Sequence, residues 1–234
     1  MKHFVQISDC HIDDNAQVMG VDSHTNLKKV VDKITTLESD ALVISGDLAH
    51  NGTRQSYKKL KQILAPINTN IFAITGNHDN AENLNTELGE YLFDTVTLGA
   101  WEIATIDSVQ VGKSSGFVSA KALAKLDTQL QSSNAKYALV VLHHPVVPMN
   151  SNWNDALSLE NPQDLFAVLD KHSKIQALLF GHAHESAEFS KKGLKIIACP
   201  STALQFNDEN AIGFNYYTLF DDGQLTYETQ WITR

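Results

Sequence analysis

The sequence predicts a mixed α/β fold in which two β-sheets stack face to face and helices cover their outer sides. Apolar runs of strand length alternate with amphipathic helical windows over the first 90 residues, whereas the second half is rich in strands and closes with hairpins. Strands that alternate with helices favour a parallel sheet, and returning hairpins add antiparallel strands. Because 234 residues with 43% apolar content allow one large core, we expect a single domain over residues 1–234.

The first 75 residues predict two strand-helix-strand steps. A strand over residues 4–8 precedes a helix whose apolar positions run from Leu27 to Leu37, and residues 41–45 form the second strand. A second helix ends before Pro66, and residues 71–75 form the third strand. Because helical crossovers join parallel strands, we expect these three strands to lie side by side.

The pattern changes beyond residue 90, where a hairpin turns at Gly99-Ala100 between runs at residues 91–98 and 101–107. Asn161-Pro162 has the composition of a helix start, with an N-cap followed by proline at the first helical position. The other predicted elements are helices over residues 119–130 and 162–169, strands over residues 137–142 and 175–180, and hairpins that turn at Lys192-Gly193 and Asp221-Asp222-Gly223.

The acidic balance restricts the expected partners. A formal charge of -9 and a pI near 5.5 disfavour nucleic acid, whose binding needs many Lys and Arg contacts, while a small anion held by metals stays compatible. No signal-like apolar core follows Met1-Lys2 and no apolar span approaches about 18 residues, so we expect a cytoplasmic protein with no membrane contact. Both a monomer and a homodimer are compatible with the sequence.

Cys10 and Cys199 are expected to be reduced thiols, because an isolated pair of cysteines in an intracellular chain is seldom a disulfide. Cys10 lies between two candidate metal ligands. Alternation along a strand would point its side chain away from theirs, which predicts a packing role for Cys10.

Five short motifs rich in histidine and aspartate occur where predicted strands end. They are Asp9-Cys10-His11, Gly46-Asp47, Gly76-Asn77-His78-Asp79, His143-His144-Pro145 and Gly181-His182-Ala183-His184. Imidazole, carboxylate and carboxamide ligands suit manganese, iron, zinc or cobalt, and there are enough of them for two ions. The sequence therefore predicts metal-assisted hydrolysis at a site with two metals.

Taken singly, these motifs are compatible with plainer roles. Asp47 after a strand is often a turn or N-cap residue, and a lone buried histidine is commonly a packed core residue. Asp9 and His11, like His182 and His184, are two residues apart, so on an ideal strand each pair faces one side and can hold one ion. Six of the ten histidines lie inside the motifs, which favours the metal site over independent coincidences.

In their order along the chain, the motifs resemble those of the calcineurin-like metallophosphoesterases: Asp-Xaa-His, Gly-Asp, Gly-Asn-His-Asp/Glu, His and Gly-His-Xaa-His. The resemblance implies a four-layer αββα sandwich and two divalent or trivalent ions, iron or manganese, with zinc or cobalt as alternatives. The implied ligands are Asp9, His11, Asp47 and His184 for one ion, and Asp47, Asn77, His143 and His182 for the other.

The same resemblance implies roles for residues beside the metals. His78 would contact the phosphate and the leaving group as a catalytic acid, and Asp79 would orient it. Asn77, His78 and His184 are the implied substrate-binding residues.

Four further segments look like the bacterial class III cyclic-AMP phosphodiesterases, at residues 19–22, 46–49, 143–145 and 200–206. This likeness covers nearly the whole chain and implies hydrolysis of 3′,5′-cyclic AMP to AMP by a hydroxide that bridges the metals. Because the motifs specify the metals and not the leaving group, 2′,3′-cyclic nucleotides and glycerophosphodiesters stay open as substrates. A non-catalytic scaffold is a further alternative, which the presence of His78 disfavours.

The longest stretch without clear periodicity is residues 144–160, directly after a candidate ligand. Such loops are often functional, so we expect either a flap over the site or a plain surface excursion. Trp153 in this stretch and Phe206 in the segment 200–206 can each face a purine or simply pack.

Overall fold

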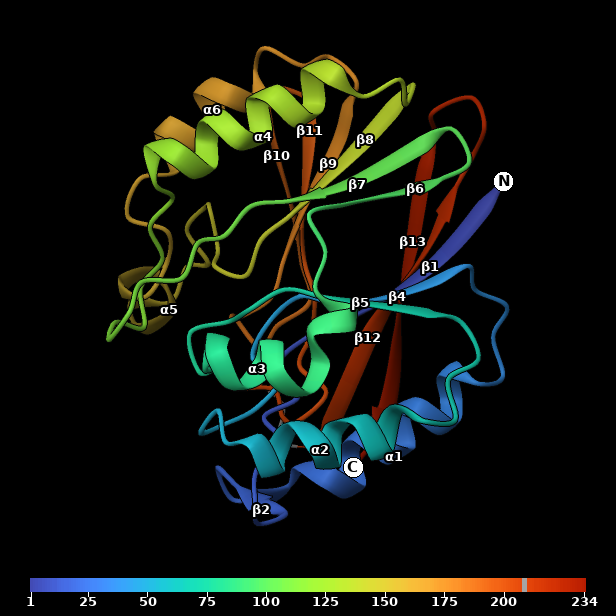
Figure 1. The fold of residues 1–234 in the computed structure, drawn as a ribbon, viewed down its shortest axis with the longest axis vertical. Helices are drawn as coiled ribbons and strands as arrows, with labels where there is room; N and C mark the ends of the chain where they lie inside the picture. Colours follow the sequence, from blue (N-terminus) through green and yellow to red (C-terminus); the bar gives the residue numbers. More distant parts are fainter. Residues whose placement is uncertain (208–209) are drawn as a thin grey trace.

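The computed structural model describes residues 1–207 and 210–234, and it has four layers, with helices outside two stacked β-sheets (Figure 1). One apolar core lies between the sheets, and one lies between each sheet and its helices. The predicted mixed α/β sandwich is confirmed.

The first sheet has the strand order β13-β12-β1-β4-β5. Its strands β1 (Lys2–Ile7), β4 (Ala41–Ile44) and β5 (Asn70–Ala73) are parallel neighbours, as the alternating pattern predicted. The C-terminal hairpin of β12 (Ala211–Leu219) and β13 (Leu225–Thr233) completes the sheet, with β12 antiparallel to β1.

The second sheet has the order β10-β11-β9-β8-β7-β6. The hairpin of β6 (Thr95–Leu98) and β7 (Trp101–Thr105) turns at Gly99-Ala100 as expected. Parallel pairing joins β7 to β8 (Tyr137–Val141), β8 to β9 (Ile175–Phe180), and β9 to β11 (Leu194–Ala198). The edge strand β10 (Ala187–Lys191) pairs antiparallel with β11 through the predicted turn at Lys192-Gly193.

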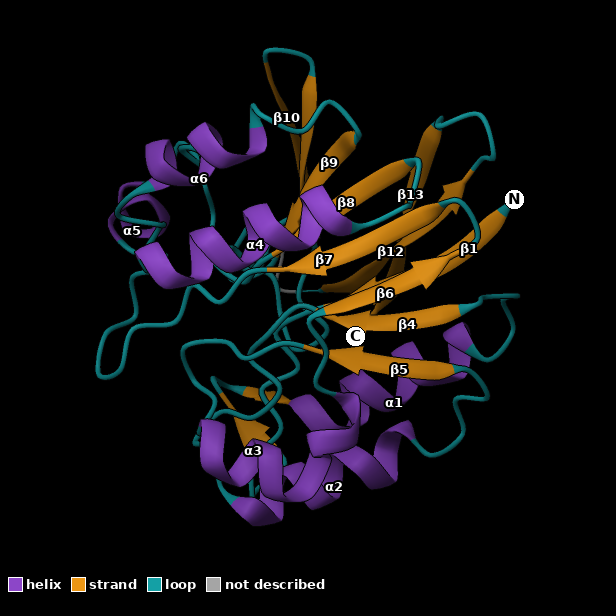
Figure 2. Ribbon diagram, turned by 45° about the horizontal axis from the view of Figure 1, so that its top comes forward, coloured by secondary structure: helices purple, strands orange, loops and turns teal. Residues whose placement is uncertain are grey.

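Helices cover the two outer faces (Figure 2). The helices α1 (Ser23–Ile34), α2 (Arg54–Leu64) and α3 (Ala81–Leu88) bury their apolar sides against the first sheet. The helices α4 (Ala120–Ser132) and α6 (Pro162–Leu169) do the same on the second sheet. Because each helix buries only one apolar stripe, the polar opposite faces form the surface of the molecule.

Some local predictions were wrong. Residues 91–94 do not extend a strand, because a 3₁₀ turn η1 (Gly89–Tyr91) precedes β6. Two short elements lie inside stretches without a clear period: α5 (Asn152–Ala156) and a small ladder of β2 (Gln17–Val18) with β3 (Val21–Asp22). Helix α3 was not predicted either, although the Asn80 side chain caps it by accepting from Asn83 N.

Cys10 and Cys199 are free and fully buried, as expected for packed thiols. Within residues 1–207 and 210–234, none of the helices has the length and apolar content to span a bilayer.

Candidate metal centre

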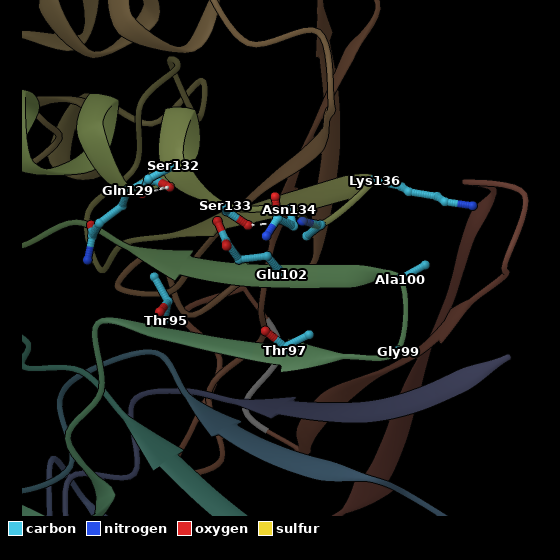
Figure 3. Close-up of a pocket in the computed structure, with 11 residues that line it drawn as sticks. Thr95, Thr97, Gly99, Ala100, Glu102, Gln129, Ser132, Ser133, Asn134 and Lys136 are labelled. Atoms are coloured by element: carbon cyan, nitrogen blue, oxygen red, sulfur yellow. Dashed lines mark hydrogen bonds between the residues drawn. The ribbon is translucent and has the colours of Figure 1, made fainter.

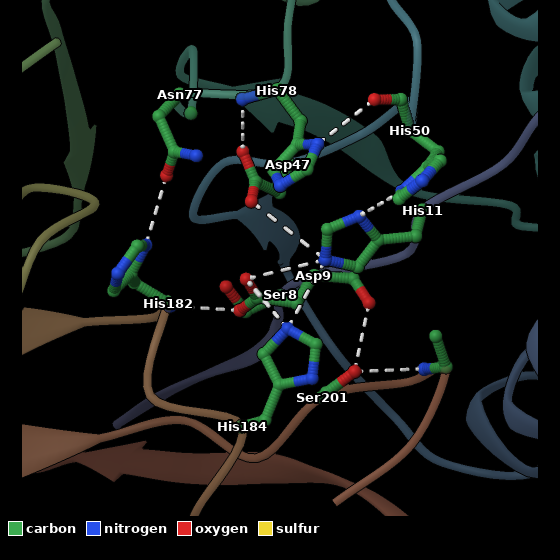
Figure 4. Close-up of polar contacts among 12 residues, drawn as sticks. Ser8, Asp9, His11, Asp47, His50, Asn77, His78, His182, His184 and Ser201 are labelled. Carbon is green, nitrogen blue, oxygen red and sulfur yellow. Dashed lines mark hydrogen bonds and ion pairs between the residues drawn. The ribbon is translucent and has the colours of Figure 1, made fainter. Parts of the chain in front are cut away.

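The seven predicted ligands converge where strands of both sheets end at one edge of the sandwich. Figure 4 shows Asp9, His11, Asp47, Asn77, His182 and His184. The segments that follow β1, β4 and β5 approach from one sheet, and those that follow β8 and β9 approach from the other. Parallel strands bring their carboxyl ends to a common edge, which is why residues far apart in sequence meet here. The ligands supplied by these segments are Asp9, His11, Asp47, Asn77, His143, His182 and His184.

The backbone around the ligands is not the ideal strand that the spacing suggested. The ligands Asp9, His11, Asp47, His182 and His184 all have φ between 45° and 64°, in the left-handed region. Their paired convergence therefore results from left-handed turns after the strands and not from strand alternation, so that part of the prediction was wrong. Strained conformations of this kind concentrate at functional sites.

Two glycines let the ligand segments approach closely. A Cβ on Gly76 would overlap the carboxylate and backbone nitrogen of Asp47, and a Cβ on Gly181 would overlap Ser8 Oγ and crowd Asp9 Oδ2. Neither glycine has a positive φ, so space and not backbone freedom explains their presence.

The first ligand group lies around Asp9. His11 Nε2 and His184 Nε2 are 3.1 Å apart. Asp9 Oδ1 lies 3.4 Å from His184 Nε2 and 3.9 Å from His11 Nε2, while Asp9 Oδ2 accepts a hydrogen bond from His182 N. Asp47 also approaches this group, and its Oδ2 atom lies 3.7 Å from His11 Nε2.

The second ligand group lies around Asn77. Its Oδ1 atom is 2.9 Å from His182 Nδ1 and 3.1 Å from His143 Nε2, and those two nitrogens are 3.3 Å apart. Asp47 Oδ1 lies 3.4 Å from His143 Nε2. Asp47 thus has one carboxylate oxygen toward each group, the geometry of a bridging ligand.

Backbone carbonyls fix the orientation of two ligand rings. His143 Nδ1 donates to Ser45 O at 2.9 Å, and His184 Nδ1 donates to Leu204 O at 3.0 Å. Because a ring nitrogen that faces a carbonyl must carry the hydrogen, Nε2 of each ring is the nitrogen turned to the site. This is the usual arrangement around histidines that bind metals.

Burial and mutual attraction shift the pKa values of the site in opposite directions. Burial raises the pKa values of Asp9 and Asp47, but the histidines around them hold both below the usual range. Burial lowers the pKa of His143, yet the Asp47 carboxylate outweighs it and raises that pKa to about 9. Burial lowers the pKa of His11 to about 3 and that of His182 to about 4. The two carboxylates and the imidazoles of His11 and His182 are therefore in the protonation state that a cation requires, whereas a cation would have to displace the proton that the Asp47 carboxylate favours on His143.

The donor set fits metal ions. Asp9 Oδ1 is buried and accepts no hydrogen bond from any residue that the structure describes, while two ring nitrogens face it. The groups Asp9-His11-His184 and Asp9-Asp47-His143 each gather their ligand atoms within 4.8 Å. Buried lone pairs that point at one another are costly unless a cation lies among them, so the residues present fit a dinuclear metal centre.

The contacts of His78 differ from the expectation. Its Nδ1 atom donates to His50 O at 2.9 Å, and the Asp79 carboxylate is directed elsewhere. Asp79 accepts from Leu48 N, Ala49 N, Gly76 N and the Tyr57 hydroxyl at 2.9 to 3.1 Å. Asp79 therefore ties together the two loops that carry Asp47 and His78, whereas the His50 carbonyl orients the His78 ring.

Sequence reasoning missed several supporting residues. Ser201 Oγ donates to Asp9 O at 2.9 Å and accepts from Ala203 N and Leu204 N, so it fixes the turn behind His184. The Tyr57 hydroxyl donates to Asp79 and accepts from Asn80 N. Tyr57 carries no local sequence signal for this role, because Asp79 and Asn80 lie more than 20 residues away along the chain. Ser201 lies in the segment 200–206 that the sequence placed near the site, but its side-chain hydrogen bond to Asp9 O was not predicted.

The segment 144–160 lies against the site. Asn154, in α5, is 3% exposed and donates from Nδ2 to the carbonyl oxygen of Ala183, between two ligands. By contrast, a cavity of about 660 Å³ between the β6-β7 hairpin and the end of α4 has none of the seven predicted ligands in its lining, which includes Thr95, Glu102 and Gln129 (Figure 3). That cavity is separate from the metal centre.

Comparisons with known proteins agree with this geometry. A family model for calcineurin-like phosphoesterases matches residues 2–186. A probable cyclic nucleotide phosphodiesterase of Ruthia magnifica subsp. Calyptogena magnifica is 61% identical over 233 residues, which are 99% of this chain and 100% of that protein. The 3′,5′-cyclic adenosine monophosphate phosphodiesterase CpdA of Pseudomonas aeruginosa is 32% identical, with 94% of this chain and 86% of that protein covered.

Solved structures show the same fold at low sequence identity. A dimetal phosphatase from Danio rerio has a TM-score of 0.79 at 15% identity, over 99% of this chain and 98% of that one. The matched family model spans the five ligand motifs, and the ligands converge in space as those motifs require. The chain belongs to the calcineurin-like phosphoesterase family.

Proposed function

We propose that the protein is a metal-dependent phosphodiesterase that hydrolyses 3′,5′-cyclic AMP to AMP. The observation that carries this proposal is the convergence of two ligand groups around Asp47, with the exposed His78 beside them but outside both groups. The names of the relatives with 61% and 32% identity support the substrate class.

The chemistry divides between the ions and the chain. Two bound ions supply a Lewis acid for the phosphoryl oxygens and lower the pKa of a water nucleophile. Asn77 directs Oδ1 at the ligand rings, which leaves its Nδ2 hydrogens for a phosphoryl oxygen. His184 borders the same space and, with Asn77 and His78, is a proposed substrate contact.

His78 is the proposed acid for the leaving group. Its Nδ1 hydrogen is committed to His50 O, so Nε2 is the nitrogen that can carry a transferable proton. When the bond from phosphorus to O3′ breaks, O3′ takes that proton and departs as a hydroxyl. The proposed role of Asp79 is indirect: it holds the loop that places His78.

We further propose iron or manganese as the physiological metals, with zinc or cobalt as alternatives. The set of imidazole, carboxylate and carboxamide ligands favours these borderline ions over Mg²⁺, which prefers oxygen ligands and retained waters.

A comparison of substrates tests the proposed activity. We expect manganese-loaded protein to give its highest kcat/KM with 3′,5′-cyclic AMP, measured beside 2′,3′-cyclic AMP, a glycerophosphodiester and bis(p-nitrophenyl) phosphate, and to release 5′-AMP. A higher kcat/KM for one of the other natural diesters would replace cyclic AMP as the substrate. Retention of two ions without turnover of any diester would indicate a scaffold.

A further inference from the structure

Two large aromatic rings stand exposed beside the metal ligands. Trp153 is 55% exposed and Phe206 is 47% exposed. Their ring centroids are 4.9 Å apart with an interplanar angle of 79°, an edge-to-face contact. Phe206 also stacks on the ring of His184, with centroids 4.3 Å apart and planes within 8°. The pair thus forms an apolar patch in direct contact with a metal ligand, and such patches mark binding sites.

The metal site itself holds both rings in position. Next to Trp153, the buried Asn154 donates to Ala183 O in the ligand segment, so the helix α5 presents Trp153 outward while it is anchored inward. Two residues before Phe206, the carbonyl oxygen of Leu204 accepts from His184 Nδ1. Both rings are therefore tied to the segment that carries His182 and His184, and their place relative to the metals is defined.

The two aromatic rings of this patch suit the flat, aromatic base of a cyclic nucleotide. When the phosphate binds among the ligands, the base lies one ribose away from the metals. Phe206 stacks on the ligand His184 and therefore lies at the border of the phosphate site. From this geometry we infer that Trp153 and Phe206 form the nucleobase subsite, an inference that rests on the proposed phosphodiesterase function. Because stacking uses the ring face and not the hydrogen-bonding edge, the subsite favours purines over pyrimidines and separates adenine from guanine weakly.

A neighbouring cavity offers the competing location for the base. It has a volume of about 450 Å³ and is lined by Glu185, Ser186, Asn207, Ala211 and Trp231. Trp231 is 51% exposed, nearly the same as Trp153, but it lies on β13 and packs over Gly213. Trp231 therefore provides a matched control for the removal of an exposed tryptophan.

The first experiment measures binding and needs no turnover. We expect AMP to bind the manganese-loaded protein about tenfold more tightly than ribose 5-phosphate, which has the same phosphate and sugar without the base. Trp153→Ala and Phe206→Leu should each reduce this ratio severalfold while two ions stay bound. Phe206→Leu keeps an apolar contact on His184, and Trp231→Ala should leave the ratio unchanged.

The second experiment measures turnover. Trp153→Ala should raise KM for 3′,5′-cyclic AMP about tenfold and raise KM for a glycerophosphodiester far less, since that diester has no aromatic group to stack in the subsite. Equal losses on both substrates, equal binding of AMP and ribose 5-phosphate by the wild type, or an effect at Trp231 in place of Trp153 would each overturn the assignment. A wild type that hydrolyses only bis(p-nitrophenyl) phosphate would instead refute the proposed function, while the binding ratio would still test the subsite.

Discussion

His78 donates the Nδ1 hydrogen to the carbonyl oxygen of His50 at 2.9 Å, and the two rings stack with centroids 5.0 Å apart. A backbone carbonyl cannot change its protonation, so it holds His78 in one orientation whatever the charge of the ring. The His78 ring also meets the His11 ring edge to face, with centroids 4.9 Å apart. The acid is therefore placed beside the first ligand group by main chain that follows Asp47.

Removal of the proposed acid should separate proton transfer from metal binding. We expect His78→Ala to retain both ions and to lose about 10²- to 10⁴-fold in kcat with 3′,5′-cyclic AMP, whose alkoxide leaving group needs a proton. Hydrolysis of bis(p-nitrophenyl) phosphate should fall much less, because p-nitrophenolate departs unprotonated. Equal losses with both leaving groups would reduce His78 to a phosphate-positioning residue.

Removal of the proposed bridge should affect both ions together. Asp47→Ala takes away the carboxylate that has one oxygen toward each ligand group, so we expect metal content to fall well below two ions and activity to be nearly abolished. Elemental analysis of the purified variant measures this. Asp14→Ala, which removes an exposed carboxylate that accepts a hydrogen bond from Thr53 Oγ1, is the control. Two bound ions and normal turnover in Asp47→Ala would show that the bridge is misassigned.

Removal of the metals should abolish activity reversibly. We expect EDTA to abolish hydrolysis of cyclic AMP, and Mn²⁺ or Fe²⁺ to restore it at lower concentration than Mg²⁺, because imidazole ligands favour the softer ions. Metal titrations of the stripped protein, followed by initial rates, test this order. Full activity in excess EDTA, with metal content shown to be negligible, would contradict a metal-dependent reaction.

A methyl group at Gly181 should damage the centre without removing a ligand. In Gly181→Ala the added Cβ would collide with Ser8 Oγ and crowd Asp9 Oδ2, so we expect a loss of about 1–3 kcal/mol in the free energy of unfolding and weaker metal binding. Urea unfolding and metal titration measure the two effects. Gly89→Ala is the matched control, because its Cβ would meet only the end of the Asn85 side chain at 3.2 Å. Equal behaviour of the two variants would show that the close approach at Gly181 is unimportant.

The sequence predicted the parts of the fold that depend on local pattern. Apolar runs and crossover helices gave β1, β4 and β5, and the turn residues gave the hairpins at Gly99-Ala100 and Lys192-Gly193. Short elements such as α5 and β2 were not predicted, because an element of a few residues is too short to show a full period of apolar residues. The position of β12 beside β1 also could not be read locally, because it results from tertiary packing.

The motifs named the seven residues that converge in the structure, since Asp, Asn and His at strand ends carry a chemical signal of their own, and their role as metal ligands stays a prediction. The geometry by which they converge was not predicted. The left-handed backbone at Asp9 and His182 was not predicted. In this conformation, residues two apart in the chain converge through turns and not through strand alternation. The roles of Tyr57 and the His50 carbonyl depend on contacts between distant segments, which a motif does not encode.

The pairing of β1 with β12 affects the order of events during synthesis. All seven ligands have been translated by residue 184, but β1 gains its antiparallel partner only with residues 211–219. Ser201, which anchors Asp9, also comes after the last ligand. A nascent chain therefore holds every proposed ligand before it holds the strand that completes the first sheet, which positions Asp9, His11, Asp47 and Asn77. Loading with metal should then be a late step, after release of the C-terminal hairpin from the ribosome.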